Sequence, residues 1–260
     1  MRDNSANTML RRIASTLLDS IFPVTCSLCN AHGSFICDAC LNTLPKRDVQ
    51  HCGACGVREM HLGTICKNCI GTVAHDGVFA IYHYDHRAIA HLIHLFKYRF
   101  IKGIGEPLGS QIGKVLTQTA IPFPDAILPV PLHPKRKRWR GWNQAEILTE
   151  SLLKNLPPEN TPVFLRDRLI RIRFTAPQMS LSQRADRQEN IRNAFQIKQI
   201  PDQSTTTKHN SKKHEKPFDI AGKRLWIVDD VTASGSTISA CAQVLKEAGA
   251  REVIGIVLAR

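Results

Sequence analysis

The sequence predicts an α/β protein in which a parallel sheet is flanked by helices and preceded by a small N-terminal metal-binding module. After residue 76, short apolar runs of β-rich composition alternate with segments of helical periodicity, which is the pattern of a parallel sheet. Before that point, eight of the nine cysteines fall between residues 26 and 69. A chain of 260 residues is long enough for one full α/β domain and one such module.

Residues 1–25 are expected to form a short N-terminal helix, because their apolar side chains recur at helical spacing: Leu10, Ile13, Leu17 and Ile21. The segment lacks the basic region and continuous apolar stretch of a signal peptide. No apolar run in the chain approaches the ~20 residues that span a bilayer. We therefore expect a cytoplasmic protein that is not an integral membrane protein, with peripheral attachment to the inner face of the membrane as the alternative.

Four Cys-x-x-Cys pairs dominate residues 26–72, the predicted double zinc-binding module. A two-residue gap lets both thiolates of a pair face one ion, and two pairs complete a tetrahedral shell for Zn²⁺. Disulfides would need an oxidising compartment, which the missing signal peptide argues against. We predict one or two structural zinc ions with these ligands: Cys26, Cys29, Cys37, Cys40, Cys52, Cys55, Cys66 and Cys69. The spacing allows sequential or interleaved pairing, and His32, His51 and His61 are expected on the surface.

The α/β domain is predicted to span residues 73–260, and periodicity assigns its first elements. They are a strand at 78–84, helices at 88–97 and about 105–118, a short buried strand at 125–131, a helix that starts at Gly-x-Asn-Gln 141–144, and a strand at 163–165. Cys241 is expected to be a small buried side chain on the apolar face of a later helix.

A loop unusually dense in positive charge is predicted directly after the strand at 125–131. Five of the six residues from 135 to 140 are cationic: Lys135, Arg136, Lys137, Arg138 and Arg140. Such a cluster repels itself unless an anion or solvent occupies its centre, and its place at a strand end favours a pyrophosphate or polyanion site over a solvated surface. Trp139 and Trp142 are candidates for stacking on the bases of a single strand, although core packing is expected for at least one.

The segment 163–198 is rich in Arg and Gln and shows little apolar periodicity after its first strand. We expect a mobile basic flap and not a core element, with a plain surface loop as the alternative. A flap would exclude water from chemistry at a sugar anomeric carbon. Its candidate binding residues are Gln178, Arg184, Arg187 and Arg192. Residues 199–217 are polar and low in complexity, which predicts a disordered basic insertion.

The most informative stretch is residues 225–237. An apolar run at 225–228 predicts a buried parallel strand, Asp229 and Asp230 follow at its tip, and a hydroxyl-rich loop leads into a helix at 238–248. Ligands of open α/β sheets bind beyond such strand ends, where loop amides and a helix N-terminus favour a phosphate. The acidic pair can accept hydrogen bonds from sugar hydroxyls or coordinate Mg²⁺. The alternative is that it merely caps the next helix.

We therefore predict a site for a phosphorylated sugar, and its loop residues are Thr232, Ala233, Ser234, Gly235, Ser236 and Thr237. The formal net charge of the chain is +13, so its electrostatic field favours polyanions. Nucleic acid is a credible partner on this ground, although many basic proteins bind only a small anionic substrate.

Several motifs in combination resemble the competence protein F (ComF) family. They are the four cysteine pairs, Pro129-Val130-Pro131-Leu132, Arg140-Gly141-Trp142-Asn143-Gln144, Gln178 with Leu181-Ser182, Arg187 with Asn190, Ala194-Phe195, Val228-Asp229-Asp230 and Leu258-Ala259-Arg260. Trp142 stands where the family usually has Phe, and the insertion at 199–217 is atypical. The stretch 225–237 is similar to the phosphoribosyl pyrophosphate (PRPP) motif of type I phosphoribosyltransferases, with Ala233 and Ser234 where that family often has Thr-Thr.

The resemblance implies a type I phosphoribosyltransferase-like sheet behind an N-terminal zinc module. It implies that Asp229 and Asp230 hold the ribose hydroxyls of PRPP, that residues 232–237 wrap its 5-phosphate, and that Mg²⁺ accompanies PRPP. Two functions compete. One is Mg²⁺-dependent transfer of phosphoribose to an acceptor in the setting of DNA uptake, together with competence or DNA-processing proteins. The other is a non-catalytic factor that binds single-stranded DNA and keeps the phosphoribosyl site as a sensor or vestige.

Overall fold

The computed structural model describes residues 24–175, 191, 193–198 and 218–260. Three predictions therefore fall outside the described residues. They are the N-terminal helix, the insertion at 199–217, and the flap residues Gln178, Arg184, Arg187 and Arg192.

Five parallel strands form the central sheet, in the spatial order β1–β7–β6–β2–β3. They are β1 (Gly77–Tyr82), β2 (Ala126–Pro129), β3 (Val163–Phe164), β6 (Arg224–Val231) and β7 (Glu252–Ala259). β6 lies at the centre, and its residues 225–228 are buried on both faces of the sheet. The predicted α/β fold class is confirmed, and the apolar run at 225–228 is a central strand because helices cover both of its faces.

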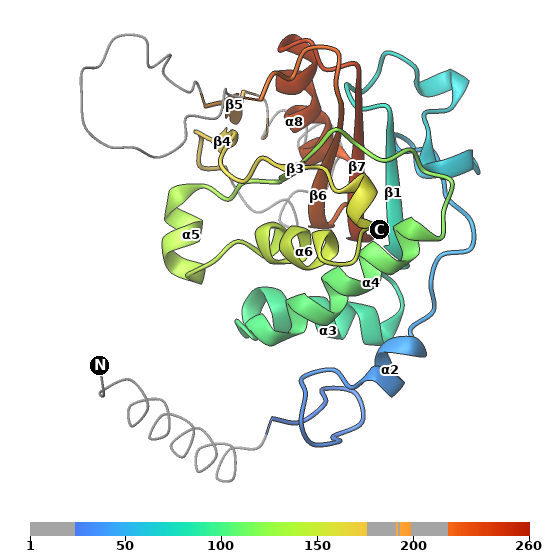
Figure 1. Ribbon diagram of the computed structural model, residues 1–260, viewed down its shortest axis with the longest axis vertical. Helices are drawn as coiled ribbons and strands as arrows, with labels where there is room; N and C mark the ends of the chain where they lie inside the picture. Colours follow the sequence, from blue (N-terminus) through green and yellow to red (C-terminus); the bar gives the residue numbers. More distant parts are fainter. Residues whose placement is uncertain (1–23, 176–190, 192, 199–217) are drawn as a thin grey trace.

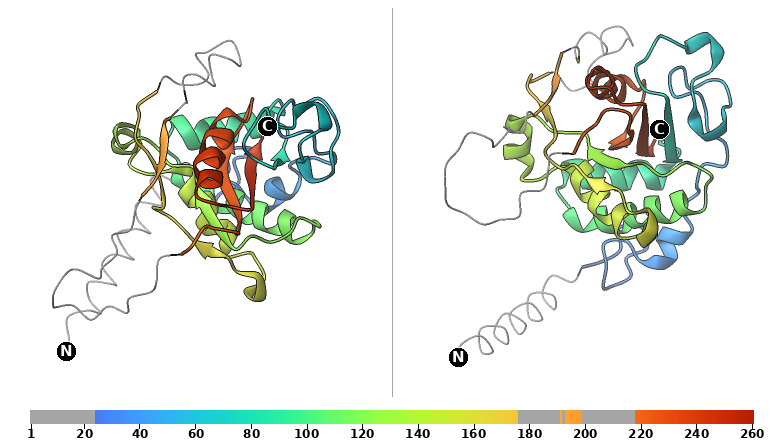
Figure 2. Two further views of the ribbon diagram at one scale, coloured as in Figure 1. Left: turned by 90° about the horizontal axis from the view of Figure 1, so that it is seen from above. Right: turned by 45° about the horizontal axis from the view of Figure 1, so that its top comes forward.

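Helices form one layer on each side of this sheet (Figures 1 and 2). α3 (Arg87–Tyr98), α4 (Gly105–Thr117) and α6 (Gln144–Leu153) cover one face, and α8 (Ser236–Glu247) covers the other. Alternate β6 side chains enter the two cores. Trp226 and Val228 pack in the core that contains the three helices, whereas Leu225 and Ile227 pack in the core beneath α8, where Cys241 is fully buried as expected.

Short elements complete the chain. They are α2 (Asp38–Asn42), α5 (Pro134–Arg140), and the 3₁₀ turns η1 (His61–Gly63), η2 (Lys67–Cys69), η3 (Lys102–Ile104) and η4 (Pro158–Asn160). Among the described residues, no helix is long and apolar enough to cross a membrane.

The basic segment predicted as a loop is a helix, α5, so that prediction was wrong. The imidazole Nδ1 of His133 accepts a hydrogen bond from the Lys135 amide at 3.2 Å and caps the helix, Pro134 occupies its first turn, and Gly141 ends it with φ 78°. Long unbranched Lys and Arg side chains have high helix propensity, and cations are favoured at a helix C-terminus. The following helix, α6, starts as predicted, with the Asn143 side chain accepting from the Ala145 amide at 3.1 Å.

The segment predicted as a flap contains core elements at both ends, so it is not a flap throughout. β4 (Leu169–Arg171) pairs antiparallel with β5 (Phe195–Ile197), and this ribbon packs on the α8 side of the sheet. Leu169 and Phe195 are buried there. Each strand is only three residues long, which is too short for a period-2 pattern to stand out among the arginines.

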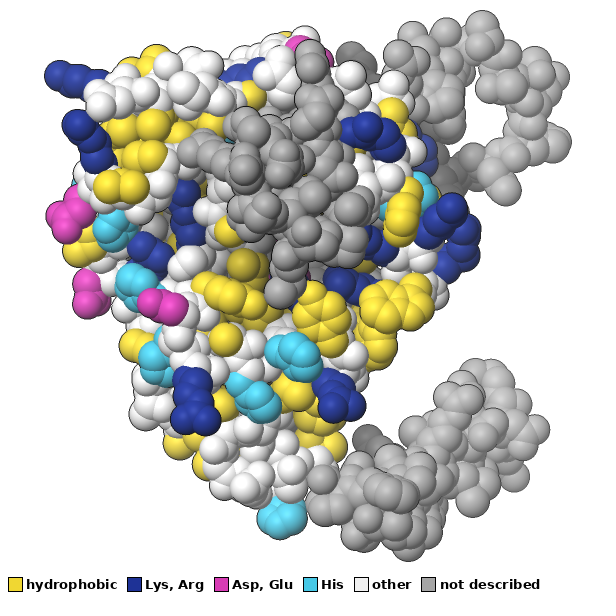
Figure 3. All heavy atoms as spheres, turned by 180° about the vertical axis from the view of Figure 1, so that it is seen from behind, with side chains coloured by type: hydrophobic (Ala, Val, Ile, Leu, Met, Phe, Trp, Pro, Cys, Tyr) yellow, Lys and Arg dark blue, Asp and Glu magenta, His cyan; other side chains and the backbone are white. Residues whose placement is uncertain are grey.

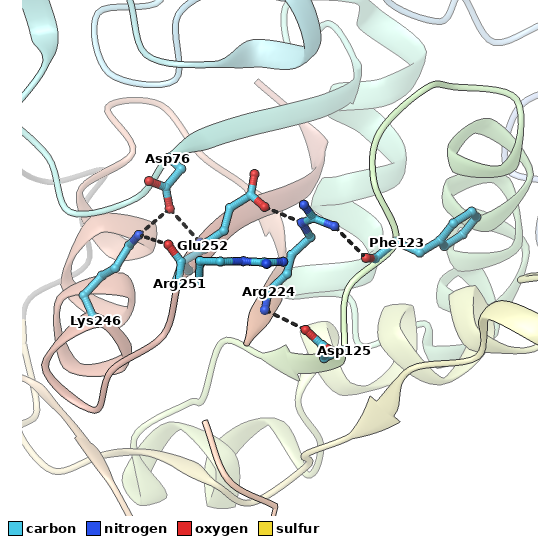
Figure 4. A network of polar contacts seen from close by, with 8 residues as sticks. Asp76, Phe123, Asp125, Arg224, Lys246, Arg251 and Glu252 are labelled. Carbon is cyan, nitrogen blue, oxygen red and sulfur yellow. Dashed lines mark hydrogen bonds and ion pairs between the residues drawn. The ribbon is translucent and has the colours of Figure 1, made fainter. Parts of the chain in front are cut away.

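A polar network ties together the starts of the central strands, at the edge opposite the acidic pair (Figure 4). The Asp125 carboxylate accepts from the Arg224 amide at 2.8 Å, and Arg224 also pairs with Glu252. The Asp76 carboxylate binds Lys246 Nζ and the Val253 amide, each at 2.7 Å. These contacts align β6, β7 and β1 with one another. They thereby fix the relative positions of the carboxyl ends of these strands at the opposite edge of the sheet.

Candidate functional site

The carboxyl ends of β6 and β2 form a topological switch point. The two strands are neighbours, but the chain leaves β6 through α8 on one face and leaves β2 through α5 and α6 toward the other edge of the sheet. The Val130 amide donates to the Val228 carbonyl at 2.8 Å, so the two exits start side by side. Ligands of open α/β sheets bind at such a point. The fold therefore brings the predicted phosphate loop, residues 232–237, and the basic segment, residues 135–140, to one edge.

The acidic pair at the tip of β6 is held by a lysine that sequence reasoning missed. Lys97 Nζ, from the last turn of α3, lies 2.8 Å from Asp230 Oδ1, and only 9% of the Asp230 side chain is exposed. Burial lowers the pKa of Lys97, but the charge of Asp230, the hydrogen bond to it and the charge of Asp229 together outweigh burial, so the pKa is raised. In the sequence, Lys97 reads only as a cation that favours the C-terminal end of a helix.

Asp229 has a different electrostatic environment from its neighbour. Burial and, next, the charge of Asp230 raise the pKa of Asp229 to about 7, against the opposing effect of Lys97. Asp229 Oδ1 accepts the Asp230 amide at 2.9 Å. An anion whose pKa is raised in this way gains from any cation or hydroxyl donor that enters the site. The pair thus combines Asp230, which has Lys97 as a close cation, with Asp229, which forms no ion pair among the described residues.

The phosphate loop turns tightly between β6 and α8. The Thr232 amide donates to the Ala259 carbonyl of β7 at 3.2 Å, and Thr232 Oγ1 accepts the Gly235 amide at 3.1 Å. Gly235 has φ 73°, a left-handed conformation that favours glycine, and α8 starts at the next residue. The first-turn amides of a helix have no intrahelical acceptor, and its dipole is positive at this end. The loop therefore has the local chemistry of a phosphate cradle.

Two arginines add positive charge beside the acidic pair. Arg136 of α5 donates to the Thr175 carbonyl at 2.8 Å, and Arg171 of β4 bonds the hydroxyl of the same threonine. Burial lowers the pKa of Arg171, and the charge of Arg136 lowers it further, whereas the charge of Asp229 raises it. Two partly desolvated guanidinium groups repel each other, and an anion that binds between them makes their proximity favourable. Sequence reasoning did not single out Arg171, because the sequence around it contains many other arginines.

Of the other cations of the basic segment, Lys135 shares the Phe174 ring with Arg136, whereas Lys137 and Arg140 bind α6. Lys137 Nζ pairs with Glu146 at 3.0 Å, and Arg140 donates to the Gln144 side chain at 3.1 Å. Lys135 lies 5.6 Å from the centre of the Phe174 ring, and Arg138 is exposed. Of the five predicted cations, Arg136 is therefore the one that binds Thr175 beside Arg171, and the other four lie on the surface of α5 or bind α6.

Exposed aromatic rings accompany these surface cations. Trp139 is 64% exposed and meets Phe100 edge-on at 5.2 Å, while Arg140 lies over Tyr98 at 5.8 Å. Trp142 instead packs against Phe96 in the core. α5 is on the left in Figure 1 and hence on the right in Figure 3, where cationic and hydrophobic side chains lie next to each other. We call Tyr98, Phe100, Trp139 and Arg140 the aromatic patch.

The eight cysteines of the N-terminal module form two groups of four. Cys26, Cys29, Cys37 and Cys40 make the first, and Cys52, Cys55, Cys66 and Cys69 make the second; within each, all Sγ atoms lie within 4.8 Å of one another. This is the sequential pairing, one of the two arrangements that the spacing allows. Cys29 Sγ and Cys37 Sγ are 3.6 Å apart, too far for a disulfide of about 2.05 Å but suitable for two ligands of one ion.

Hydrogen bonds from backbone amides favour the thiolate form of these cysteines, which is the form that binds a cation. The Cys37 amide donates to Cys26 Sγ at 3.4 Å, and the Cys66 amide donates to Cys52 Sγ at 3.2 Å. Burial raises the pKa of the Cys26 thiol, but the hydrogen bonds from backbone amides outweigh it and bring the pKa to about 6. Hydrogen bonds from the Arg58 and Val57 amides likewise lower the pKa of Cys55 to about 6. The donor set fits Zn²⁺ held by four thiolates.

Comparisons with known proteins agree with both parts of the site. Residues 17–70 match the double zinc ribbon domain family, and residues 179–260 match the phosphoribosyl transferase domain family. Competence protein F of Haemophilus influenzae is 28% identical over 223 residues, which cover 84% of this chain and 87% of that protein. The chain is similar to competence protein F over most of its length.

Two further relatives are DNA utilization protein YhgH of Salmonella typhi and of Escherichia coli K12, both 28% identical. They cover 84% and 89% of this chain and 87% and 94% of their own lengths. Among solved structures, the allosteric regulatory enzyme of purine biosynthesis matches with a TM-score of 0.31 and 19% identity, over 60% of this chain and 26% of that one.

Proposed function

We propose that the protein binds PRPP together with Mg²⁺ and transfers its phosphoribosyl group to an acceptor, in the setting of DNA uptake or DNA utilisation. The observation that carries this proposal is the acidic pair at the tip of the central strand β6, followed at once by a phosphate cradle at the start of α8. The match of residues 179–260 to the phosphoribosyl transferase domain family supports it. The names of the relatives, competence protein F and DNA utilization protein, support the biological setting.

Each part of the site has a role in this proposal. Asp229 and Asp230 accept hydrogen bonds from the two ribose hydroxyls, and residues 232–237 hold the 5-phosphate. Arg136 and Arg171 stabilise the negative charge that develops on pyrophosphate as it leaves the anomeric carbon. Lys97 holds the Asp230 carboxylate in one direction through the ion pair, so that the ribose is held in one orientation while an acceptor nitrogen attacks.

Mg²⁺ would be held by carboxylate oxygens of the acidic pair and by PRPP itself, since hard oxygen donors suit this ion. When bound, it supplies charge neutralisation for the pyrophosphate. Titration of PRPP into the protein, with and without Mg²⁺ and followed by calorimetry, tests the proposal. Release of pyrophosphate from PRPP across a panel of nitrogenous bases then tests catalysis and identifies the class of acceptor.

A second candidate function is binding of single-stranded DNA at the aromatic patch. Such binding needs exposed rings and cations interleaved on one surface, because bases stack on the rings and phosphates form ionic contacts with the cations. Trp139 is the favoured stacking residue, being 64% exposed. The two functions are compatible, since the patch lies on α3, α5 and the segment after α3, whereas the phosphate loop lies between β6 and α8. Salt-dependent oligonucleotide binding separates this candidate from the first.

A further inference from the structure

The second cysteine group lies directly against the phosphate loop. Gly53, which follows the ligand Cys52, has its carbonyl oxygen so close to Gly235 that an added Cβ at Gly235 would lie 3.1 Å from it. The same Cβ would lie 3.3 Å from Nε2 of the buried His75. Gly235 caps α8 in a left-handed conformation, so the metal-binding turn supports the one residue of the loop whose backbone geometry is most restricted.

A second connection runs through the end of the chain. The Arg260 side chain donates to the Cys52 carbonyl at 3.1 Å, and its guanidinium packs under Gly56 of the same turn. Arg260 follows Ala259, whose carbonyl accepts the Thr232 amide at 3.2 Å. The second cysteine group is thus connected to the phosphate loop at two points, Thr232 and Gly235.

The segment after the last cysteine of this group also binds α8. The Ala74 amide donates to Ser239 Oγ at 3.0 Å, in the first turn of that helix. The module covers the free edge of β1 as well. The Gln50 side chain bonds both the amide and the carbonyl of Ala80, at 3.0 and 2.9 Å, and so replaces a neighbouring strand.

The first cysteine group packs elsewhere. Its Phe35 ring lies against Gly103 of η3, and Ile36 and Leu41 join the core formed with α3, α4 and α6. Figure 1 shows α2 beside α3 and α4, while the segment of the second group lies beside β1. The chain therefore contains an internal control, namely two four-cysteine sites of the same chemistry, of which one contacts the phosphate loop.

We propose that metal binding at the second cysteine group holds the phosphate loop in its binding shape, so that loading of this site, and not of the first, sets the affinity for the phosphorylated ligand. The inference rests on the proposed function for the identity of that ligand. Within this ribbon the fully buried side chains are Cys52, Ala54 and Cys66, so the metal supplies much of its folding free energy. Loss of the metal releases the Gly53 and Cys52 carbonyls and, with them, both supports of the loop.

Coupling of this kind is reciprocal, because two binding events that share one conformation must favour each other equally. Ligand in the phosphate loop should therefore slow the loss of zinc from the second group to a chelator. It should leave the first group unchanged, since Phe35 packs on η3, and Ile36 and Leu41 pack in the core formed with α3, α4 and α6.

The first test compares amide hydrogen exchange of residues 230–240 in two matched variants, Cys66→Ser/Cys69→Ser and Cys37→Ser/Cys40→Ser, each with its zinc content measured. We expect the second-group variant to exchange at least tenfold faster in this segment and the first-group variant to match the parent. Equal exchange in both variants would overturn the inference. This readout needs no ligand, so it decides the coupling even where PRPP does not bind and the proposed function fails.

The second test measures PRPP affinity by calorimetry in the same variants. We expect a loss of tenfold or more for the second-group variant and less than twofold for the first. Because a cysteine variant can lose its fold, Arg260→Gln provides a milder probe that keeps all eight ligands. It should keep two zinc ions and still weaken PRPP binding several-fold. Unchanged affinity in Arg260→Gln and in the second-group variant contradicts the inference.

Discussion

Lys97 Nζ, at the end of α3, lies 2.8 Å from Asp230 Oδ1, at the end of β6. The contact joins a helix on one face of the sheet to the acidic pair at its carboxyl edge. Both side chains are largely withdrawn from water, with 18% and 9% of their surfaces exposed. A pair of this kind makes the orientation of Asp230 depend on α3, an element more than 120 residues earlier in the chain.

Lys97→Met should lower the free energy of unfolding by about 3 kcal/mol, because it leaves a buried carboxylate without its cation. Urea denaturation at pH 7 measures this loss. The double variant Lys97→Met/Asp230→Asn should recover part of it, since the uncompensated charge is then gone. A double variant no more stable than the single one would show that Lys97 acts through packing and not through the ion pair.

The acidic pair should also make stability depend on pH in an unusual direction. Burial raises the pKa of Asp229 to about 7, above the value of about 3.9 for an unfolded chain. Between these values the folded state binds more protons than the unfolded state, so the contribution of Asp229 to stability falls as pH rises from about 4 to 7. Asp229→Asn should remove this slope and raise the melting temperature at pH 8 by several degrees. A melting temperature that falls in the variant at pH 8 would contradict the assignment.

The same protonation should oppose binding of PRPP. Ribose hydroxyls and Mg²⁺ require the ionised carboxylate, so affinity should rise about tenfold per pH unit below 7 and level off above it. Calorimetry between pH 5.5 and 8.5 measures the profile. Asp229→Asn serves as the control. This variant should bind PRPP more weakly, and its affinity should no longer rise steeply with pH below 7.

Metal analysis should find two zinc ions per chain, one in each cysteine group. The two groups have separate four-thiol shells, so Cys37→Ser/Cys40→Ser and Cys66→Ser/Cys69→Ser should each retain one zinc. Elemental analysis of protein prepared without chelator is the measurement. A single zinc in the parent protein, or loss of both ions in the first-group variant, would count against independent sites.

The aromatic patch gives a prediction about DNA that is independent of the phosphate loop. Trp139→Ala should weaken binding of a single-stranded oligonucleotide by about 1–3 kcal/mol with little change in salt dependence, since it removes stacking. Lys135→Ala/Arg138→Ala should instead reduce the slope of log affinity against log salt by about 0.7 for each lost phosphate contact. Lys137→Ala is the matched control, because Lys137 is already paired with Glu146. Equal effects of all three changes would exclude the patch as a DNA surface.

Much of this architecture was predictable because its signals are local. The apolar run 225–228, the pair Asp229-Asp230 and the small residues after them lie in one contiguous stretch, and each cysteine pair carries its own ligand spacing. The strand order and the switch point then follow from packing, since β2 and β6 are almost 100 residues apart yet hydrogen-bonded. Domain limits at residues 25, 72 and 73 stay predictions.

The rest depended on contacts that no local pattern encodes. Lys97 reads as a helix-end cation, and Arg171 reads as one of many surface arginines, until the fold brings both toward the acidic pair. The repulsion among the cations of residues 135–140 predicts a loop, and this prediction was wrong. His133 caps the segment at its start and Gly141 ends it, so that the residues between them form the helix α5. The contact of Gly53 with Gly235 joins two glycines 182 positions apart, which only the tertiary structure reveals.

The most direct test of the central claim is calorimetric titration of PRPP with Mg²⁺ into the parent protein and into Asp229→Asn/Asp230→Asn. Asp219→Asn is the control, because this exposed aspartate precedes β6 at the opposite edge of the sheet. Loss of charge-assisted bonds to two ribose hydroxyls should cost on the order of 2–5 kcal/mol, or about 30-fold or more in affinity. We predict saturable binding to the parent and control proteins and a loss of at least this size in the double variant. Equal affinity in all three proteins, or no binding to the parent, would contradict a PRPP site at the end of β6.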